Sequence, residues 1–379
     1  MAGFFCALFY TFYSINSLCW YRFQYVQKIK FSISFILWLS CLSAFSQIGG
    51  NYTYQFLTVH PNARIAALGG LAIATPDNDI NLAAQNPAML RTDMHNQISY
   101  SHVFLFSDIQ SGYVAHARHY EGVGTFAAGI QYISYGNFQR TASNGESLGT
   151  FTAGEYAFQM AYSKKLDQYF SIGGQIKLIY SSLAEFNSFG GAIDAGITYH
   201  NPEKLFTASL AVTNFGTQFS TYTDNSDREK LPTNLMLGMS KKLQNAPFRF
   251  TLTGKYLNQP GKLLYQNANK PTAQKDLETG ETIEEDLNFG KQVMSHVNAN
   301  VELLFGKNFY FGLGYNYLRR WEMGLKDLAG GAGFSWGFGL KISKFQLAYG
   351  NISYFVGNST DHLTVIFNIN DFKKKKSEQ

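Results

Sequence analysis

Phe334-Ser335-Trp336-Gly337-Phe338-Gly339-Leu340-Lys341-Ile342 alternates without exception: every even-numbered residue is large and apolar, and every odd-numbered interior residue is serine, glycine or lysine. Successive side chains of a β-strand point to opposite faces of the sheet. One face of this strand therefore meets an apolar medium, and the other meets a polar one. When such alternation recurs along a chain, it is typical of a transmembrane β-barrel.

The same alternation recurs almost to the C-terminus. Each run is close to the roughly ten residues that a tilted strand needs to cross a bilayer. We therefore predict an all-β transmembrane fold, an antiparallel outer-membrane β-barrel of about 14 strands. The strands are expected to begin near Gln97, Ser111, Gly124, Gly154, Phe170, Phe189, Lys204, Thr233, Pro247, Met294, Asn308, Ala332, Lys344 and Asp361.

The lengths of the expected connections support this fold. Links after even-numbered strands are brief, and most links after odd-numbered strands are longer, including 136–153, 215–232, 259–293 and 319–331. Outer-membrane barrels have short turns on the periplasmic side and long loops outside. An even number of strands then leaves both the N-terminus and the C-terminus in the periplasm. A soluble β-solenoid or sandwich is the alternative, and it would leave the aromatic rows exposed as aggregation-prone patches.

The composition fits the same fold. Charged residues make up 15% of the 379 residues, against about 25% in ordinary soluble domains. The mean hydropathy of -0.15 nevertheless looks soluble, because the lipid-facing and lumen-facing halves of each strand cancel in an average. The net charge is +5, and no basic stripe with interleaved aromatics accompanies it. We therefore expect no nucleic-acid partner.

Residues 1–46 are expected to be a leader. Lys28 and Lys30 precede an apolar stretch that runs to Phe45, and cleavage after Ser46 would complete a secretory signal peptide over about 28–46. Residues 1–27 fit no signal peptide, which suggests a misassigned upstream start. Cys6, Cys19 and Cys41 all lie in this leader, so the processed chain is expected to have neither a disulfide nor a cysteine metal site.

Residues 47–95 do not alternate and are expected to form a hatch in front of the barrel at 96–371, with a basic tail at 372–379. The Ala-rich stretch 62–68 predicts a short helical turn that Gly69 and Gly70 end in left-handed conformations. Asn86-Pro87-Ala88 predicts a proline-fixed turn. A barrel of about fourteen strands has a lumen too wide for side chains alone to fill, and a hatch would close it.

This stretch also carries a family resemblance. Its ordered motifs resemble the N-terminal signature of the PorQ family of type IX secretion system proteins, although His60 and Asn62 depart from the leucine-like and serine-like residues expected there. The matching motifs are Gly49-Gly50, Tyr54-Gln55-Phe56-Leu57, Ala63-Arg64, Ala66-Ala67-Leu68-Gly69-Gly70, Asp77, Asp79 and Asn86-Pro87-Ala88-Met89-Leu90. More broadly, the plan is similar to the FadL-like outer-membrane family, which includes PorV-related barrels.

The resemblance implies a non-enzymatic component of type IX protein secretion that aids the export or surface attachment of cargo proteins. The implied partners are outer-membrane lipid and other Por-family secretion proteins. The alternative implied by the wider FadL-like resemblance is a channel for uptake of hydrophobic small molecules. That alternative predicts an apolar pocket beside the hatch and a lateral opening in the wall.

The candidate site residues are structural. Arg64, Asp77 and Asp79 are expected to form a charged network in the lumen, because burying an ion without a partner is costly. We favour anchoring of the hatch over ligand binding as the role of this network. Gly69 and Gly70, with Asn86, Pro87 and Ala88, complete the predicted hatch motif.

No catalytic, cofactor or metal site is expected. His60 and His95 flank the hatch, but no third ligand joins them at metal-like spacing. Gly-x-Ser-x-Gly occurs around Ser147 and around Ser335, yet this motif forms a nucleophile elbow only between a strand and a helix. The first copy lies in a predicted loop and the second within a predicted strand, so neither indicates an enzyme.

Overall fold

The computed structural model describes residues 52–59, 61–224, 226–259, 263, 273–275, 282–284, 289–324, 330–355 and 357–372. The predicted leader at 1–46, the basic tail beyond Phe372 and the candidate residue His60 lie outside this range. So do residues 47–51 of the predicted hatch, with the Gly49-Gly50 motif, and most of the predicted 259–293 loop.

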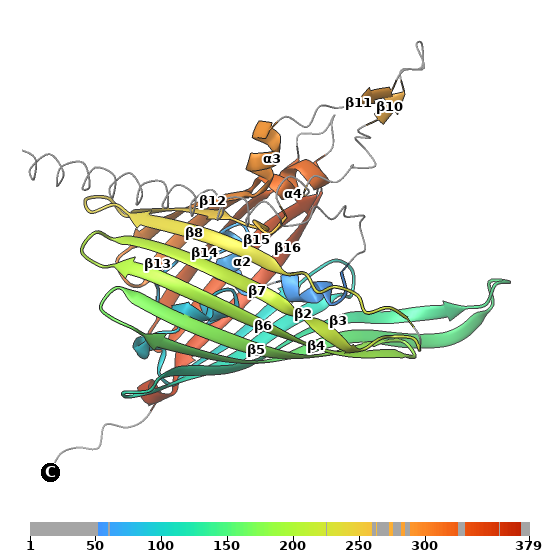
Figure 1. Ribbon diagram of the computed structural model, residues 1–379, viewed down its shortest axis with the longest axis horizontal. Helices are drawn as coiled ribbons and strands as arrows, with labels where there is room; N and C mark the ends of the chain where they lie inside the picture. Colours follow the sequence, from blue (N-terminus) through green and yellow to red (C-terminus); the bar gives the residue numbers. More distant parts are fainter. Residues whose placement is uncertain are drawn as a thin grey trace, which may run out of the picture. The chain divides into compact units, whose positions relative to one another are not determined.

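Fourteen antiparallel strands close into a barrel in which each strand is hydrogen-bonded to both of its neighbours, and β1 pairs with β16 to complete the ring (Figure 1). The predicted fold class is therefore confirmed. The strands are β1 (Gln97–Phe104), β2 (Gln110–Tyr120), β3 (Gly124–Thr141), β4 (Ser147–Lys165), β5 (Phe170–Leu183), β6 (Phe186–Asn201), β7 (Phe206–Ser220), β8 (Asn234–Lys242), β9 (Phe248–Gly254), β12 (Val297–Phe305), β13 (Phe309–Asn316), β14 (Phe334–Ile342), β15 (Phe345–Phe355) and β16 (Asn358–Asn368). Two further short strands, β10 (Ala273–Lys275) and β11 (Thr282–Glu284), pair only with each other.

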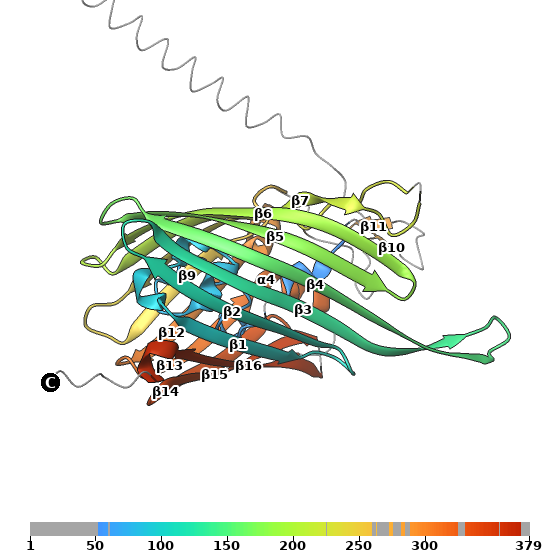
Figure 2. The ribbon, with the colours of Figure 1, turned by 90° about the horizontal axis from the view of Figure 1, so that it is seen from below.

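Each predicted strand start lies within three residues of the observed one except that of β4, which was expected near Gly154 and begins at Ser147. The prediction that 136–153 is a loop was therefore wrong. Strands β3 and β4 continue through it as a paired hairpin, which projects beyond the other strands in Figure 2. Similarly, β7 runs to Ser220, inside the predicted link 215–232. Hydrophobic alternation cannot reveal these extensions, because a strand that has left the bilayer no longer needs one apolar face.

Burial along the wall is the reverse of that in a soluble protein. In β14, Phe334 is 56% exposed and Trp336 41% exposed, whereas Ser335 between them is 2% exposed. Apolar side chains face outward around the ring, and serine, threonine, asparagine and glutamine face the lumen. A closed ring satisfies its backbone hydrogen bonds internally, which is what the hydrocarbon core of a membrane requires. The protein is an integral outer-membrane β-barrel.

The two ends of the barrel differ. Six connections at one end are short, namely 121–123, 166–169, 202–205, 243–247, 306–308 and 343–344. We call this the turn end and the opposite end the loop end. At the loop end, β7 and β8 are separated by 221–233, and the connections after β9 and β13 include the helices α3 (Phe289–Ser295) and α4 (Tyr317–Met323).

Residues 52–59 and 61–95, which we call the inner segment, lie within the barrel and contact its inward side chains. The predicted helical turn is α2 (Ala63–Ala67), and the remaining elements are the 3-10 helices η1 (Gln55–Thr58), η2 (Ile80–Ala84), η3 (Pro87–Met89) and η4 (Thr92–Met94); a fifth, η5 (Ile369–Phe372), follows β16. In the described part of the chain, no helix is long and apolar enough to cross a membrane.

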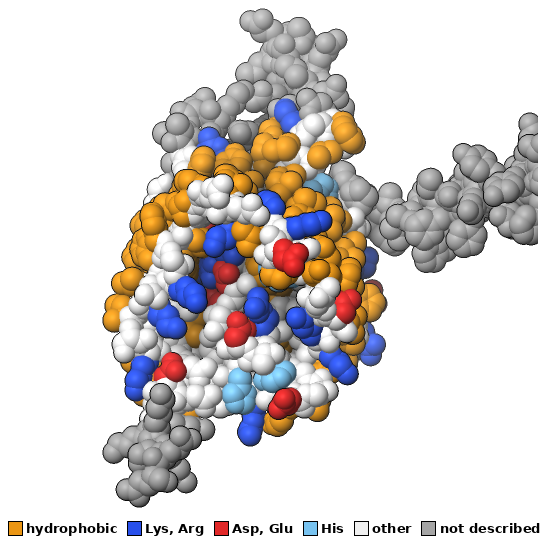
Figure 3. All heavy atoms as spheres, turned by 90° about the vertical axis from the view of Figure 1, so that its left-hand side faces the viewer, with side chains coloured by type: hydrophobic (Ala, Val, Ile, Leu, Met, Phe, Trp, Pro, Cys, Tyr) orange, Lys and Arg blue, Asp and Glu red, His pale blue; other side chains and the backbone are white. Residues whose placement is uncertain are grey.

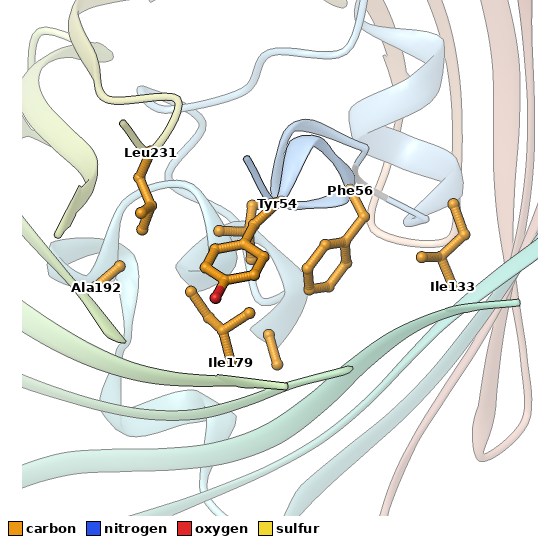
Figure 4. Packing of buried hydrophobic residues seen from close by; sticks show 8 residues of the cluster. Tyr54, Phe56, Ile133, Ile179, Ala192 and Leu231 are labelled. Atoms are coloured by element: carbon orange, nitrogen blue, oxygen red, sulfur yellow. The ribbon is translucent and has the colours of Figure 1, made fainter. Parts of the chain in front are cut away.

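A hydrophobic cluster joins the inner segment to the wall at the loop end (Figure 4). Tyr54 and Phe56 of the inner segment pack against Ile133, Ile179 and other inward apolar residues of the wall. The Tyr54 hydroxyl lies 2.5 Å from the Ser188 hydroxyl, which satisfies both buried groups. Apolar packing and polar bonding together hold this end of the inner segment.

The lipid-facing assignment predicts the effect of a charge on the wall. Leu178 on β5 is 52% exposed and faces outward, so Leu178→Arg should lower the free energy of unfolding in lipid vesicles by about 2–4 kcal/mol. Leu148, which lies in the projecting hairpin, is 59% exposed, and Leu148→Arg should change the free energy of unfolding by less than about 0.5 kcal/mol. Denaturant titration measures both free energies of unfolding. An equal loss for the two variants would contradict the assignment of Leu178 to the membrane and of Leu148 to the space outside it.

Candidate functional site

Four charged side chains connect the inner segment to the wall. Arg64 of α2 donates to Asp77 and to Glu302 of β12, with Nη2 2.8 Å from Glu302 Oε1. Arg249 of β9 donates through Nε to Glu302 Oε2 at 2.6 Å and through Nη2 to Asp77 Oδ2 at 2.6 Å. Two arginines thus share two carboxylates, and we call this the charge network.

The charge network is buried and its formal charges balance. The side chains of Arg64, Arg249 and Glu302 are 5% exposed or less, and that of Asp77 is 29% exposed. The Tyr310 ring covers Arg64, with Arg64 Cζ 4.3 Å from its centroid, a cation-π geometry that suits a desolvated guanidinium. Each ion has a partner of opposite charge, which is what makes its burial tolerable.

The network also determines protonation within the inner segment. Burial alone would raise the pKa of Asp77, but the Arg249 and Arg64 guanidiniums outweigh it and hold that pKa well below its usual range. Burial lowers the pKa of Arg64, yet the Asp77 and Glu302 carboxylates more than offset this and raise it. Asp77 and Arg64 therefore remain charged across the physiological pH range.

The structure brings together only part of the predicted set. Arg64 and Asp77 are bonded, but Asp79 makes no ion pair in the described chain. Instead, Asp79 caps η2 and accepts hydrogen bonds from the backbone and side-chain nitrogens of Asn81 at 2.9 and 2.7 Å. Burial raises the pKa of Asp79. The expectation that Asp79 joins the network was wrong, because a local cap satisfies its carboxylate first.

Sequence reasoning missed the two wall members, Arg249 and Glu302. They lie directly opposite each other in the pairing of β9 with β12. Each also occupies the polar row of an alternating strand. Charges of opposite sign at lumen-facing positions were the available signal, but about forty residues separate the two strands in sequence, and only their pairing shows that the charges meet.

Asn86, Pro87 and Ala88 lie against β5 and β6. The Asn86 side chain accepts from Ala88 N at 3.1 Å and donates to Ile73 O at 2.9 Å and to Thr198 Oγ1 at 3.0 Å. Pro87 is the first residue of η3. An N–H at this position would have no partner within the helix, so proline loses no hydrogen bond there. The predicted turn therefore attaches one stretch of the inner segment to another and to the wall.

Glycines allow the inner segment to approach the wall closely. Gly69 and Gly70 end α2 with φ angles of 83° and 88°, which only glycine adopts without strain. On the wall, a Cβ at Gly350 would lie 2.1 Å from Ala63 O, and one at Gly196 would lie 2.1 Å from Asn86 Oδ1. The wall therefore touches the backbone of the inner segment at Gly350 and the Asn86 side chain at Gly196.

Polar wall side chains around the ring bond to the inner segment. Gln131 of β3 donates to Phe56 O at 2.9 Å, Ser240 of β8 to Ala74 O at 2.7 Å, and Asn298 of β12 to Leu68 O at 2.9 Å. Thr364 of β16 accepts from Ala63 N at 2.9 Å. Bonds from strands on several sides of the lumen hold the inner segment inside the barrel.

Two cavities adjoin the inner segment. One at the turn end, of about 300 Å³, is lined by η3 and η4 residues together with His119, Lys165 and His200. The other at the loop end, of about 100 Å³, has Lys255, Asn316 and Arg319 in its lining. The described residues contain no group of three or more metal-ligating side chains.

The remaining candidate residues have structural contacts. His95 Nδ1 accepts from His119 N at 3.1 Å, and its Nε2 lies 3.0 Å from Asn96 Nδ2. Ser335 lies within β14 and donates to Ala67 O at 3.0 Å. Ser147 begins β4 and accepts from Gln139 Nε2 at 3.1 Å. In the described chain, neither serine is bonded to a histidine.

No family model matches this chain, and no curated protein matches it. Among solved structures, it is similar to the Pseudomonas putida toluene transporter TodX, with a TM-score of 0.45 and 10% identity over 80% of this chain and 95% of that one. It is also similar to a Pseudomonas aeruginosa FadL homologue, with a TM-score of 0.42 and 10% identity over 86% of this chain and 100% of that one. A Rhodopseudomonas blastica porin matches with a TM-score of 0.29 and 8% identity over 72% and 99% of the two chains. The fold assignment rests on this chain's own strand pairing.

The charge network predicts a pH-dependent stability. Asp77→Asn should lower the free energy of unfolding at neutral pH by about 3 kcal/mol, because two buried arginines would share one carboxylate. The loss should shrink as the pH falls below about 4, where Asp77 of the unfolded wild-type chain takes up a proton while folded Asp77 stays charged. Asp93→Asn is the control, because its pair with Arg91 is exposed and should contribute little. If the difference in unfolding free energy between wild type and Asp77→Asn did not change with pH, the lowered pKa of Asp77 would be contradicted.

The close contacts predict a second effect. Gly350→Ala should displace the inner segment, because its Cβ has no room beside Ala63 O. Limited proteolysis of the inner segment in vesicles should accelerate, and the conductance of planar bilayers should rise. At Gly174 the nearest atom to an added Cβ is 3.9 Å away, so Gly174→Ala should behave as wild type. Unchanged proteolysis of Gly350→Ala would show that the plug is not held there.

Proposed function

We propose that this protein is a non-enzymatic outer-membrane component of type IX protein secretion, and that it aids the export or surface attachment of cargo proteins. The resemblance of 49–90 to the PorQ family motivates the proposal. The observation that carries it is that residues of the resembling motifs shape the inner segment and hold it against the wall: Arg64 in the charge network, Gly69 at the end of α2, and Asn86 against β6.

A held plug and a continuous wall suit a scaffold better than a permanently open pore. Each strand is hydrogen-bonded to both neighbours, and inner-segment contacts come from strands on several sides of the lumen. In this proposal, both termini and the turn end face the periplasm. The projecting hairpin of β3 and β4 and the loop end face outward, where they would meet other Por-family proteins.

The second candidate is a channel for hydrophobic small molecules. The observation that favours it is the cavity at the turn end, whose lining includes Met89, Leu90 and Phe170 beside the polar groups. TodX, described as a toluene transporter and as a monoaromatic hydrocarbon channel, fits this candidate by name, but a likeness at that TM-score is no argument for it. The lateral opening that this candidate predicts would need a break in a wall that is paired all round.

Deleting the gene and complementing it with wild type or with Gly350→Ala separates the two candidates. The secretion proposal expects the deletion to reduce cargo on the cell surface, measured by surface labelling, with uptake of toluene and long-chain fatty acids unchanged. Intact cargo delivery together with lost uptake would reject it and support the channel. Gly350→Ala should then raise uptake if the plug gates a channel, and should leave uptake at wild-type level if the barrel is a scaffold.

A further inference from the structure

Each short turn at the turn end has a basic side chain within it or within three residues of it. Within these six turns and the three residues on either side of each, ten Lys and Arg residues face three Asp and Glu residues, Glu121, Asp167 and Glu203. One of the ten, Arg249, belongs to the charge network, which leaves nine. We call the nine the basic collar: Arg118, Lys164, Lys165, Lys204, Lys241, Lys242, Lys307, Lys341 and Lys344. Figure 3 looks at this end and shows Lys and Arg side chains around the face, with hydrophobic side chains on its flanks.

The loop end has the opposite balance in its described connections from β1 to β8. Six acidic residues lie there, namely Asp108, Glu146, Glu185, Asp224, Asp227 and Glu229, against three basic ones, Arg140, Arg228 and Lys230. The later loop-end connections have the reverse balance, with Lys255, Lys291, Arg319 and Arg320 against Glu322 in their described residues outside β10 and β11, so the loop end is close to neutral. The excess of positive charge therefore belongs to the turn end. A charge asymmetry between the ends of a membrane protein indicates that each rim meets a different electrostatic environment.

Aromatic side chains lie immediately inside the collar. Tyr120, Phe126 and Tyr162 contact one another on the outer wall, with ring centroids 5.8 and 4.8 Å apart. Arg118 Cζ lies 5.1 Å from the centroid of Tyr120, and Lys344 Nζ lies 4.7 Å from that of Phe372. Aromatic belts lie at the level of lipid headgroups. The outward members of the collar, such as Arg118 and Lys164, therefore have their charged ends where lipid phosphates are.

The outer wall is hollowed next to Arg118. A depression of about 820 Å³ crosses β2 to β6, because small outward residues, Ala128 and Gly174, lie among larger ones such as Met160 and Ile176. Its lining is mainly apolar and includes His116, whose buried Nε2 has no hydrogen-bond partner in the described chain. An apolar hollow beneath a cation, facing the bilayer, has the chemistry of an acyl chain below a phosphate.

We propose that the basic collar binds anionic phospholipids and that the depression beside Arg118 and His116 holds one of them, with an acyl chain along Ala128 and Gly174. The inference does not depend on which function the barrel serves. A lipid annulus is the partner that fits, because the collar includes all six turns around the circumference, whereas an acidic protein would meet a patch on one side. Each basic residue near an anionic surface favours binding roughly fivefold.

The test uses the full processed chain in nanodiscs that contain equal amounts of phosphatidylglycerol and phosphatidylcholine, with retained lipids counted by native mass spectrometry. Wild type should retain several-fold more of the anionic lipid, and excess inorganic phosphate should not displace it. Lys164→Gln with Lys204→Gln and Lys307→Gln should weaken the preference several-fold. The matched control at the loop end, Arg140→Gln with Arg228→Gln and Lys230→Gln, should keep it.

The depression is tested separately by Ala128→Leu, which fills it without changing any charge. This variant should lose the most tightly retained lipid but keep the anionic preference, whereas Val114→Leu, outside the depression, should retain that lipid. Equal retention of the two lipids by wild type would overturn the proposal. So would an unchanged preference in the collar variant, or a collar that captures an acidic periplasmic protein while remaining indifferent to lipid charge.

Discussion

The structure depends on one constraint: in hydrocarbon, every backbone N–H and C=O must be bonded within the protein. A sheet meets that constraint only by closing on itself, and closure gives every strand one face toward lipid and one toward the lumen. The alternation of Phe334 and Trp336 with Ser335 and Gly337 is the direct result, because one row contacts lipid and the other faces the lumen. The aromatic belts and the basic rim follow from the same wall, since both lie where its strands leave the bilayer.

Closure with fourteen strands creates a second requirement, because inward side chains alone do not fill so wide a lumen. The inner segment lies in this lumen, and it is held in place by chemistry that suits a buried polar interior. Two arginines and two carboxylates neutralise one another, wall amides and hydroxyls satisfy its carbonyls, and wall glycines leave room for its backbone. A second buried pair, Lys177 with Asp194 at 2.7 Å, shows the same pairing of inward charges on β5 and β6.

Much of the barrel wall could be predicted from the sequence, because alternation is a local property that each strand displays by itself. The start of β14 and the pairing of Arg64 with Asp77 could be predicted from the sequence. The extensions of β3 and β4 were not, because outside the bilayer no apolar row marks them. Asp79 was misassigned because a carboxylate in a sequence looks the same whether it will meet an arginine or cap a 3-10 helix.

By itself, the sequence determined the barrel, its number of strands, and the residues that line each face, since a strand between lipid and water must alternate wherever it crosses. It also indicated the stretch that fills the lumen. Only the tertiary structure decided what holds that stretch, because Arg249 and Glu302 reach Arg64 and Asp77 through the pairing of β9 with β12. Ion pairs and close backbone contacts depend on distances in space, and long separations in sequence conceal them.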